Sequence, residues 1–155
     1  MGVEIERKFL LRNDDWRKVA PKGIRMAQWY LNEHGNTIRV RIADDKAYLT
    51  IKSKSVGISR MEFEYEIPLA DAKDLMNLTQ TPIVDKFRYK IPYQGHVWEV
   101  DEFLGLNAGL VVAEVEMKSE DEEVAIPDWI GVDVSDDRRY RNTYLAKCPY
   151  STWTD

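Results

Sequence analysis

Charged and apolar side chains alternate with a period of two along most of the chain. Near its start, Glu4, Glu6 and Lys8 occupy every second position, with Ile5 and Phe9 between them. Residues two apart point the same way in a β-strand but roughly 200° apart in a helix. The spacing therefore predicts a strand with one charged face.

Seven further segments repeat this alternation and are separated by turn-rich sequences such as Gln94-Gly95. Consecutive strands joined by short turns are typical of an antiparallel meander. The predicted strands span residues 3–11, 25–32, 36–43, 46–54, 58–67, 84–91, 96–103 and 110–118.

Three segments have helical rather than strand patterns, at residues 13–20, 70–80 and 137–147. The first begins with acidic residues, the second has apolar residues at helical spacing, and the third ends just before Pro149. Residues 119–129 are acidic and irregular, with no regular element predicted.

The charges on each predicted strand are mostly of one sign. A charged strand face in contact with water is common, and for one strand that explanation is the usual one. Like charges side by side repel, however, so segregation over many strands favours a ligand that has both a metal and an anion. The basic positions are Lys8, Arg39, Arg41, Lys52, Lys86 and Arg88, and the acidic ones are Glu4, Glu6, Glu62, Glu64, Glu99, Asp101, Glu114 and Glu116.

A closed sheet would bring these faces together around a lumen. We therefore predict an α+β fold, an eight-stranded antiparallel β-barrel that forms a tunnel with a charged lumen. The three short helices would flank it and cover the apolar outer faces. Length, the absence of repeats and a hydrophobic fraction of 44% predict one domain over residues 1–155.

The chemistry of the predicted lumen points to metal and phosphate. Carboxylates crowded into one cavity take up protons or bind cations. Oxygen ligands without Cys, and with little His, suit Mg²⁺ or Mn²⁺ far better than zinc. Arginine and lysine suit phosphate oxygens, and a linear polyphosphate would contact several basic strands at once.

Composition excludes several other classes. A formal charge of −5 argues against nucleic acid as a partner. No segment approaches the roughly 20 apolar residues of a membrane span, so we predict no membrane association and a cytoplasmic location. The lone Cys148 cannot form an intrachain disulfide, which fits that location.

The ordered motifs resemble the CYTH superfamily, also called triphosphate tunnel metalloenzymes. The N-terminal Glu-x-Glu-x-Lys signature of that family is present as residues 4–8. Similar motifs follow in the family's order: QWYL, TIRVR, the strand with Lys52, MEFEYEI, KFRYK, WEVDEF, VVAEVEM and DDRRYRNTYLA.

This resemblance implies hydrolysis of a triphosphate inside the tunnel, dependent on a divalent metal. The basic set would hold the phosphates and act in catalysis together with Tyr30, and Arg138 and Arg139 would add to substrate binding. The implied metal ligands are Glu4, Glu6, Glu62, Glu64, Asp101, Glu114 and Glu116.

Inorganic tripolyphosphate is the substrate that we expect first, because compact members with this motif order tend toward it. Thiamine or nucleoside triphosphates, a class IV-like adenylyl cyclase reaction, and a non-catalytic polyphosphate or nucleotide sensor are the alternatives. A structural barrel with an exposed charged sheet is a further one. The sequence does not set the oligomeric state, and a homodimer is one option.

Overall fold

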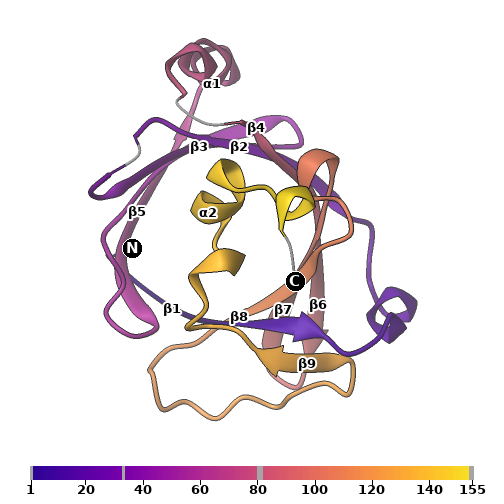
Figure 1. The fold of residues 1–155 in the computed structure, drawn as a ribbon. Helices are drawn as coiled ribbons and strands as arrows, with labels where there is room; N and C mark the ends of the chain where they lie inside the picture. The colour runs from indigo at the N-terminus through magenta and orange to yellow at the C-terminus, as the bar shows by residue number, and fades with distance from the viewer. Residues whose placement is uncertain (1, 33, 80–81, 154–155) are drawn as a thin grey trace.

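A closed antiparallel barrel forms the body of the computed structural model, which describes residues 2–32, 34–79 and 82–153. The sheet order is β5-β4-β3-β2-β6-β7-β8-β1-β9, and a further pairing of β5 with β1 closes the ring of eight strands (Figure 1). The strands are β1 Gly2–Leu11, β2 Ile24–Tyr30, β3 Thr37–Ala43, β4 Lys46–Lys52, β5 Ser59–Ile67, β6 Val84–Tyr93, β7 His96–Phe103, β8 Val111–Glu116 and β9 Ile130–Asp133. The predicted eight-stranded barrel is confirmed.

Strand β1 closes the barrel and also carries the added strand. One edge of β1 pairs with β8, from Glu6 to Leu10. On the other edge, residues 2–5 pair with β5, whereas Phe9 and Leu11 pair with β9 across a register shift. The sequence did not predict β9, because four residues are too few to show an alternation after the irregular acidic segment.

The β6–β7 hairpin turns at the predicted dipeptide. Gln94 and Gly95 both have positive φ, 44° and 87°. Two consecutive residues of that kind match the twist of the flanking strands, and glycine adopts this conformation without steric cost.

The helices are shorter than predicted. Residues 13–20 contain only the 3-10 helix η1, Asp15–Lys18. The second helix is α1, Leu69–Leu75, extended by η2, Met76–Leu78. The C-terminal segment is broken into η4, Arg138–Tyr140, and α2, Asn142–Lys147. The remaining 3-10 turns are η3, Gly105–Asn107, and η5, Tyr150–Thr152.

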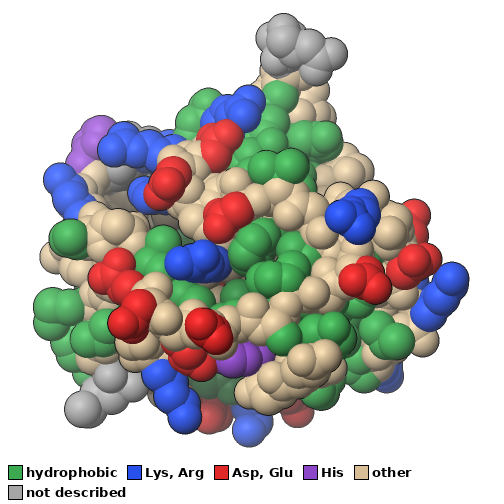
Figure 2. All heavy atoms as spheres, turned by 90° about the horizontal axis from the view of Figure 1, so that it is seen from below, with side chains coloured by type: hydrophobic (Ala, Val, Ile, Leu, Met, Phe, Trp, Pro, Cys, Tyr) green, Lys and Arg blue, Asp and Glu red, His purple; other side chains and the backbone are tan. Residues whose placement is uncertain are grey.

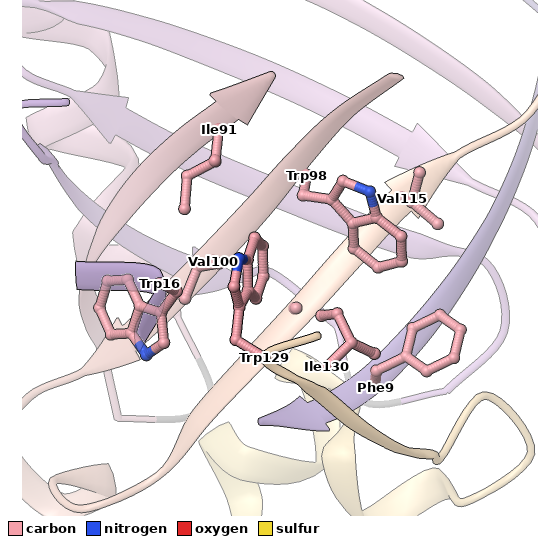
Figure 3. Close-up of a cluster of buried hydrophobic side chains, with 9 residues drawn as sticks. Phe9, Trp16, Ile91, Trp98, Val100, Val115, Trp129 and Ile130 are labelled. Atoms are coloured by element: carbon pink, nitrogen blue, oxygen red, sulfur yellow. The ribbon is translucent and has the colours of Figure 1, made fainter. Parts of the chain in front are cut away.

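Much of the hydrophobic core lies outside the ring of strands. Trp16 of η1, Trp129 and β9 cover the outer faces of β1, β6, β7 and β8 (Figure 3). Trp98 lies at the centre of this cluster, with its ring 5.4 Å from that of Phe9 and 6.2 Å from that of Trp129. A second outer cluster packs α1 against Trp29 and its neighbours on β3 and β4. Large aromatic side chains thus fill the space beneath the covering segments.

Helix α2 lies inside the ring of strands, not on its outer face (Figure 1). Leu145 and Ala146 pack against apolar residues on the lumen side of the barrel: Tyr30, Val84, Phe103, Leu110 and Val112. The prediction that all three helices cover the outside is therefore wrong for the third. At one end of the barrel, the inward-facing residues of β6, β7 and β8 are apolar. An amphipathic helix can therefore be buried against them.

The outer surface contrasts with the lumen. On the face seen in Figure 2, acidic and basic side chains are scattered among apolar ones. Among the described residues, no helix has the length and apolar character needed to cross a membrane.

Candidate active site

The lumen contains a cavity of about 230 Å³ with charged walls. Seven basic and eight acidic side chains line it. Antiparallel register brings them together, because it sets Lys8 opposite Glu114 and Lys52 opposite Glu62 on the inward faces of neighbouring strands.

Most of the residues predicted for the site line this cavity. The period of two placed them correctly on the inward faces of seven different strands. They are Glu4, Glu6, Lys8, Tyr30, Arg39, Arg41, Lys52, Glu62, Glu64, Arg88, Glu114 and Glu116.

Lys86 and Asp101 also face inward but are fully buried and do not line the cavity. The Lys86 Nζ lies 2.6 Å from Asp101 Oδ2 and 3.2 Å from Asn142 Oδ1 of α2. Asp101 also accepts two hydrogen bonds from Arg88, at 2.8 and 2.9 Å. Burial would raise the pKa of Asp101, but Arg88 and Lys86 hold it below its ordinary value. In this geometry Asp101 orients Arg88.

Arg138 and Arg139 lie away from the central cavity. Arg139 forms an exposed ion pair with Asp137 at 2.7 Å and stacks on Tyr140 and Trp153. Arg138 lines a second hollow, which adjoins the central cavity and shares Arg60 and Arg141 with its wall. Neither arginine lines the central cavity, but Arg138 shares the adjoining hollow with the predicted site residue Tyr30.

Sequence reasoning missed several residues of the cavity wall, above all Arg60 and Arg141. Arg60 shares the inward face of β5 with Glu62, so the period of two could have identified it. Its Nε lies 3.1 Å from Glu4. Arg141 lies between η4 and α2, where a regular periodicity is absent, and no sequence signal placed it. Glu99 also lines the wall, although it was not among the predicted metal ligands.

Carboxylates crowd the β1 side of the cavity. Burial, together with repulsion by Glu114 and Glu4, raises the pKa of Glu6 to about 8. Burial would also raise the pKa of Glu4 and of Glu114. Lys52 and Arg60 instead hold the pKa of Glu4 at about 2, and Lys8 and Arg88 hold that of Glu114 well below its usual range. Glu6 therefore holds its proton near neutral pH, whereas Glu4 and Glu114 are ionised.

Two arginines on β3 carry charge that the protein only partly neutralises. Burial lowers the pKa of Arg41 to about 9, and repulsion by Arg39 and Arg88 adds to the effect. Among the described residues, no carboxylate lies within 4.0 Å of the Arg41 guanidinium. The Nε of Arg39 is buried without a hydrogen-bond partner in the same part of the chain. These groups suit a bound anion.

The acidic set fits a divalent cation with oxygen ligands. Burial raises the pKa of Glu116, as do Glu4 and Glu99, so the crowding of carboxylates extends beyond Glu6. A cation among these groups would relieve the repulsion. Over the described ranges, however, no three acidic, His or Cys side chains are already gathered as a metal site. The candidate ligands on the cavity wall are Glu4, Glu6, Glu62, Glu64, Glu114 and Glu116.

Two curated proteins that are similar to this chain carry the same name. An inorganic triphosphatase from Acetivibrio thermocellus is 45% identical over 157 residues, covering 100% of both chains. Another, from Nitrosomonas europaea, is 36% identical and covers 93% of this chain and 97% of its own length.

Solved structures share the fold. A crystal structure of an inorganic triphosphatase is 31% identical, with a TM-score of 0.64, and the alignment covers 92% of this chain and 93% of that one. A proposed adenylate cyclase from Bacillus halodurans is 18% identical, with a TM-score of 0.61 and coverage of 77% and 84%, which supports the fold alone. Residues 2–145 match the CYTH domain, so this chain belongs to the CYTH family.

Proposed function

We propose that this protein hydrolyses inorganic tripolyphosphate to phosphate and diphosphate inside the barrel, with Mg²⁺ or Mn²⁺ as cofactor. The observation that carries the proposal is the cavity wall, where seven basic side chains lie among eight carboxylates. An anion with several phosphate groups, accompanied by a divalent cation, matches both sets at once.

The size of the cavity favours an inorganic substrate. Its volume of about 230 Å³ lies below the range of about 300–1,000 Å³ that is usual for pockets that hold organic ligands. The wall offers few apolar or aromatic side chains on which a nucleobase or thiamine could pack. Two curated relatives, 45% and 36% identical, are named inorganic triphosphatases, which supports the same choice.

The chain's own residues would mainly position the substrate and neutralise its charge. Arg39, Arg41 and Lys8 would bind phosphate oxygens, together with Lys52 and Arg88. Asp101 would hold Arg88 in place, and Lys86 would in turn bind Asp101. Such preorganised groups provide most of the rate enhancement in phosphoryl transfer.

The carboxylates that face the cavity would hold the cation. When bound, a divalent cation supplies charge neutralisation at the phosphate and activation of water. The ligands that we propose for it are those on the cavity wall, Glu4, Glu6, Glu62, Glu64, Glu114 and Glu116.

Phosphate release from tripolyphosphate, thiamine triphosphate, ATP and pyrophosphate tests the proposal, each with Mg²⁺, with Mn²⁺ and with chelator. We expect fast release from tripolyphosphate only when the metal is present. Preference for ATP or thiamine triphosphate would overturn the choice of substrate. No release from any of the four would overturn the proposed enzyme.

An alanine substitution tests the phosphate-binding set. Replacing Arg39 with Ala should lower kcat/KM for tripolyphosphate by about 100-fold or more, because a buried cationic donor is lost from the cavity. Arg25→Ala is the matched control, since Arg25 pairs with Asp85 and is exposed on the outer face. Equal activity of the two variants would contradict the assignment.

A further inference from the structure

A neutral side chain, Gln28, links two cavity residues. Gln28 is fully buried on the inward face of β2, opposite Arg41 of β3. Its Oε1 accepts a hydrogen bond from Arg41 Nε at 2.9 Å. Its Nε2 lies 2.7 Å from the Tyr30 hydroxyl oxygen.

The donor and acceptor roles in this chain of contacts follow from its chemistry. A guanidinium can only donate, so the Gln28 oxygen must face Arg41 and the NH₂ group must face Tyr30. The Tyr30 oxygen is then the acceptor, and its own hydrogen is not used in that contact. Within the described residues, Gln28 is the one hydrogen-bond partner of this hydroxyl.

Among the described residues, no protein group accepts a hydrogen bond from the Tyr30 hydroxyl. Tyr30 lines the cavity and lies opposite Arg39 in the β2–β3 pairing, next to Arg41. Both arginines are donors. An oxygen of a bound anion would accept from the Tyr30 hydroxyl and from the arginines together.

The neutrality of Gln28 distinguishes Arg41 from Arg88. Arg88 is fixed by Asp101, which also neutralises it, with N···O distances of 2.8 and 2.9 Å. Arg41 is fixed by an amide and keeps its charge, since across the described part of the chain no carboxylate is within 4.0 Å of it. A glutamate at this position would have the same shape but would remove that free charge.

We infer that Gln28 is a positioning residue for the triphosphate. It fixes Arg41 without neutralising it and keeps the Tyr30 hydroxyl as a donor directed at a phosphate oxygen. This inference rests on the proposed function. It assigns to the Gln28 amide the preference for an anion beside Arg41 and Tyr30.

The variants Gln28→Glu and Gln28→Met test the two parts of the inference. Gln28→Glu neutralises Arg41 and turns the Tyr30 hydrogen toward the new carboxylate. It should lower kcat/KM for tripolyphosphate by about 100-fold or more. Gln28→Met removes both hydrogen bonds without adding charge and should lower it by about 10- to 100-fold, the range typical of groups that orient a ligand-binding residue. Gln94→Glu, in the exposed β6–β7 turn, adds the same charge far from the cavity and should leave kcat/KM unchanged.

A double-mutant comparison tests the action through Tyr30. If Gln28 acts partly through that hydroxyl, Gln28→Met should reduce kcat/KM less in a Tyr30→Phe background than in the wild type. Equal reductions in both backgrounds would overturn the part of the inference that concerns Tyr30. Activity of Gln28→Glu and Gln28→Met within twofold of the wild type would overturn the whole.

Binding without turnover separates this inference from the proposed function. The rise in Tm caused by tripolyphosphate in chelator should be large for the wild type and small for Gln28→Glu. A wild type that is stabilised in this way but does not release phosphate would overturn the proposed reaction and leave the Gln28 inference supported. Equal rises in Tm for both proteins would overturn the Gln28 inference, whatever the activity.

Discussion

At the scale of single residues, neighbouring carboxylates of the lumen have opposite protonation behaviour. Glu114 lies opposite Lys8, with its Oε1 3.3 Å from the lysine nitrogen, and its pKa is low despite burial. Glu6 lies opposite Glu116 in the same pair of strands, and burial and repulsion raise its pKa to about 8. Burial acts on both carboxyls, so the neighbouring charges decide the difference: Lys8 and Arg88 lower the pKa of Glu114, whereas Glu114 and Glu4 raise that of Glu6.

This arrangement predicts a pH-dependent stability. The pKa of Glu6 is about 8 in the folded protein and 4.5 ordinarily, so the folded state holds this proton more tightly than the unfolded chain. The contribution of this proton to the free energy of unfolding is fully present below pH 4.5 and is lost as the pH rises through about 8. In chelator, we expect the Tm of the wild type to fall over this interval. Glu6→Gln should remove that part of the fall and raise the Tm at the upper end by about 2–4 °C for each kcal/mol of repulsion relieved.

Thermal unfolding as a function of pH measures this effect. Glu123→Gln removes an exposed carboxylate outside the cavity and serves as the control, with a profile like that of the wild type. Parallel wild-type and Glu6→Gln profiles would show that repulsion at Glu6 has no influence on stability.

The period of two identified most of the site residues that lie on strands, although Arg60 on β5 was missed. Lys8, Arg39 and Glu62 could be placed on inward faces because each lies within a long strand. The same rule did not separate Lys86 and Asp101 from the residues that line the cavity, since alternation gives the face but not the depth along the barrel. Arg141 could not be found at all, because it lies between two short helical turns.

At the scale of elements, strands β1 to β8 were predictable, whereas the lengths of the helices and the position of the third were not. Long alternating segments define β1 to β8, and the dipeptide Gln94-Gly95 defines a turn. By contrast, α2 has only six residues, so its position depends on tertiary packing. An apolar helix face can pack on the inside or the outside of a barrel. Helix α2 packs inside because the inward-facing strand residues are apolar at that end.

Packing of α2 within the barrel predicts a large effect of one substitution. Leu145 is fully buried against the lumen-side cluster that includes Val84 and Phe103. Leu145→Ala should lower the free energy of unfolding by about 2–5 kcal/mol through lost burial and a new cavity. Urea denaturation measures this, and Leu106→Ala, at a leucine that is 57% exposed, is the control. Similar urea midpoints for the two variants would contradict the packing of α2 inside the barrel.

At the scale of the whole molecule, the barrel has its charges inside and much of its apolar core outside. An ordinary barrel buries apolar side chains in its interior. Here the clusters beneath η1, β9 and α1 bury apolar side chains on the outer face instead. The lumen is then free to concentrate charge for binding. The predictions of an eight-stranded barrel and of CYTH family membership are confirmed, whereas the single domain over residues 1–155 and the roles of individual site residues stay predictions.

The concentration of charge predicts that a divalent cation stabilises the whole fold. A ligand that binds only the folded state at about a hundred times its Kd contributes about 2.7 kcal/mol. In a chain of this size that corresponds to a rise in Tm of about 5–10 °C. Differential scanning fluorimetry with Mg²⁺ or Mn²⁺, and no substrate, measures it.

Sodium chloride at equal ionic strength is the control, because it screens repulsion without occupying a site. We expect it to raise the Tm much less than Mg²⁺ does. Glu6→Gln should retain only part of the rise with Mg²⁺, since one carboxylate near the cation is lost and less repulsion remains to be relieved. An equal rise with both salts, or a full rise in the variant, would mean that the carboxylates respond to ionic strength alone and would remove the argument for a divalent cation in the lumen.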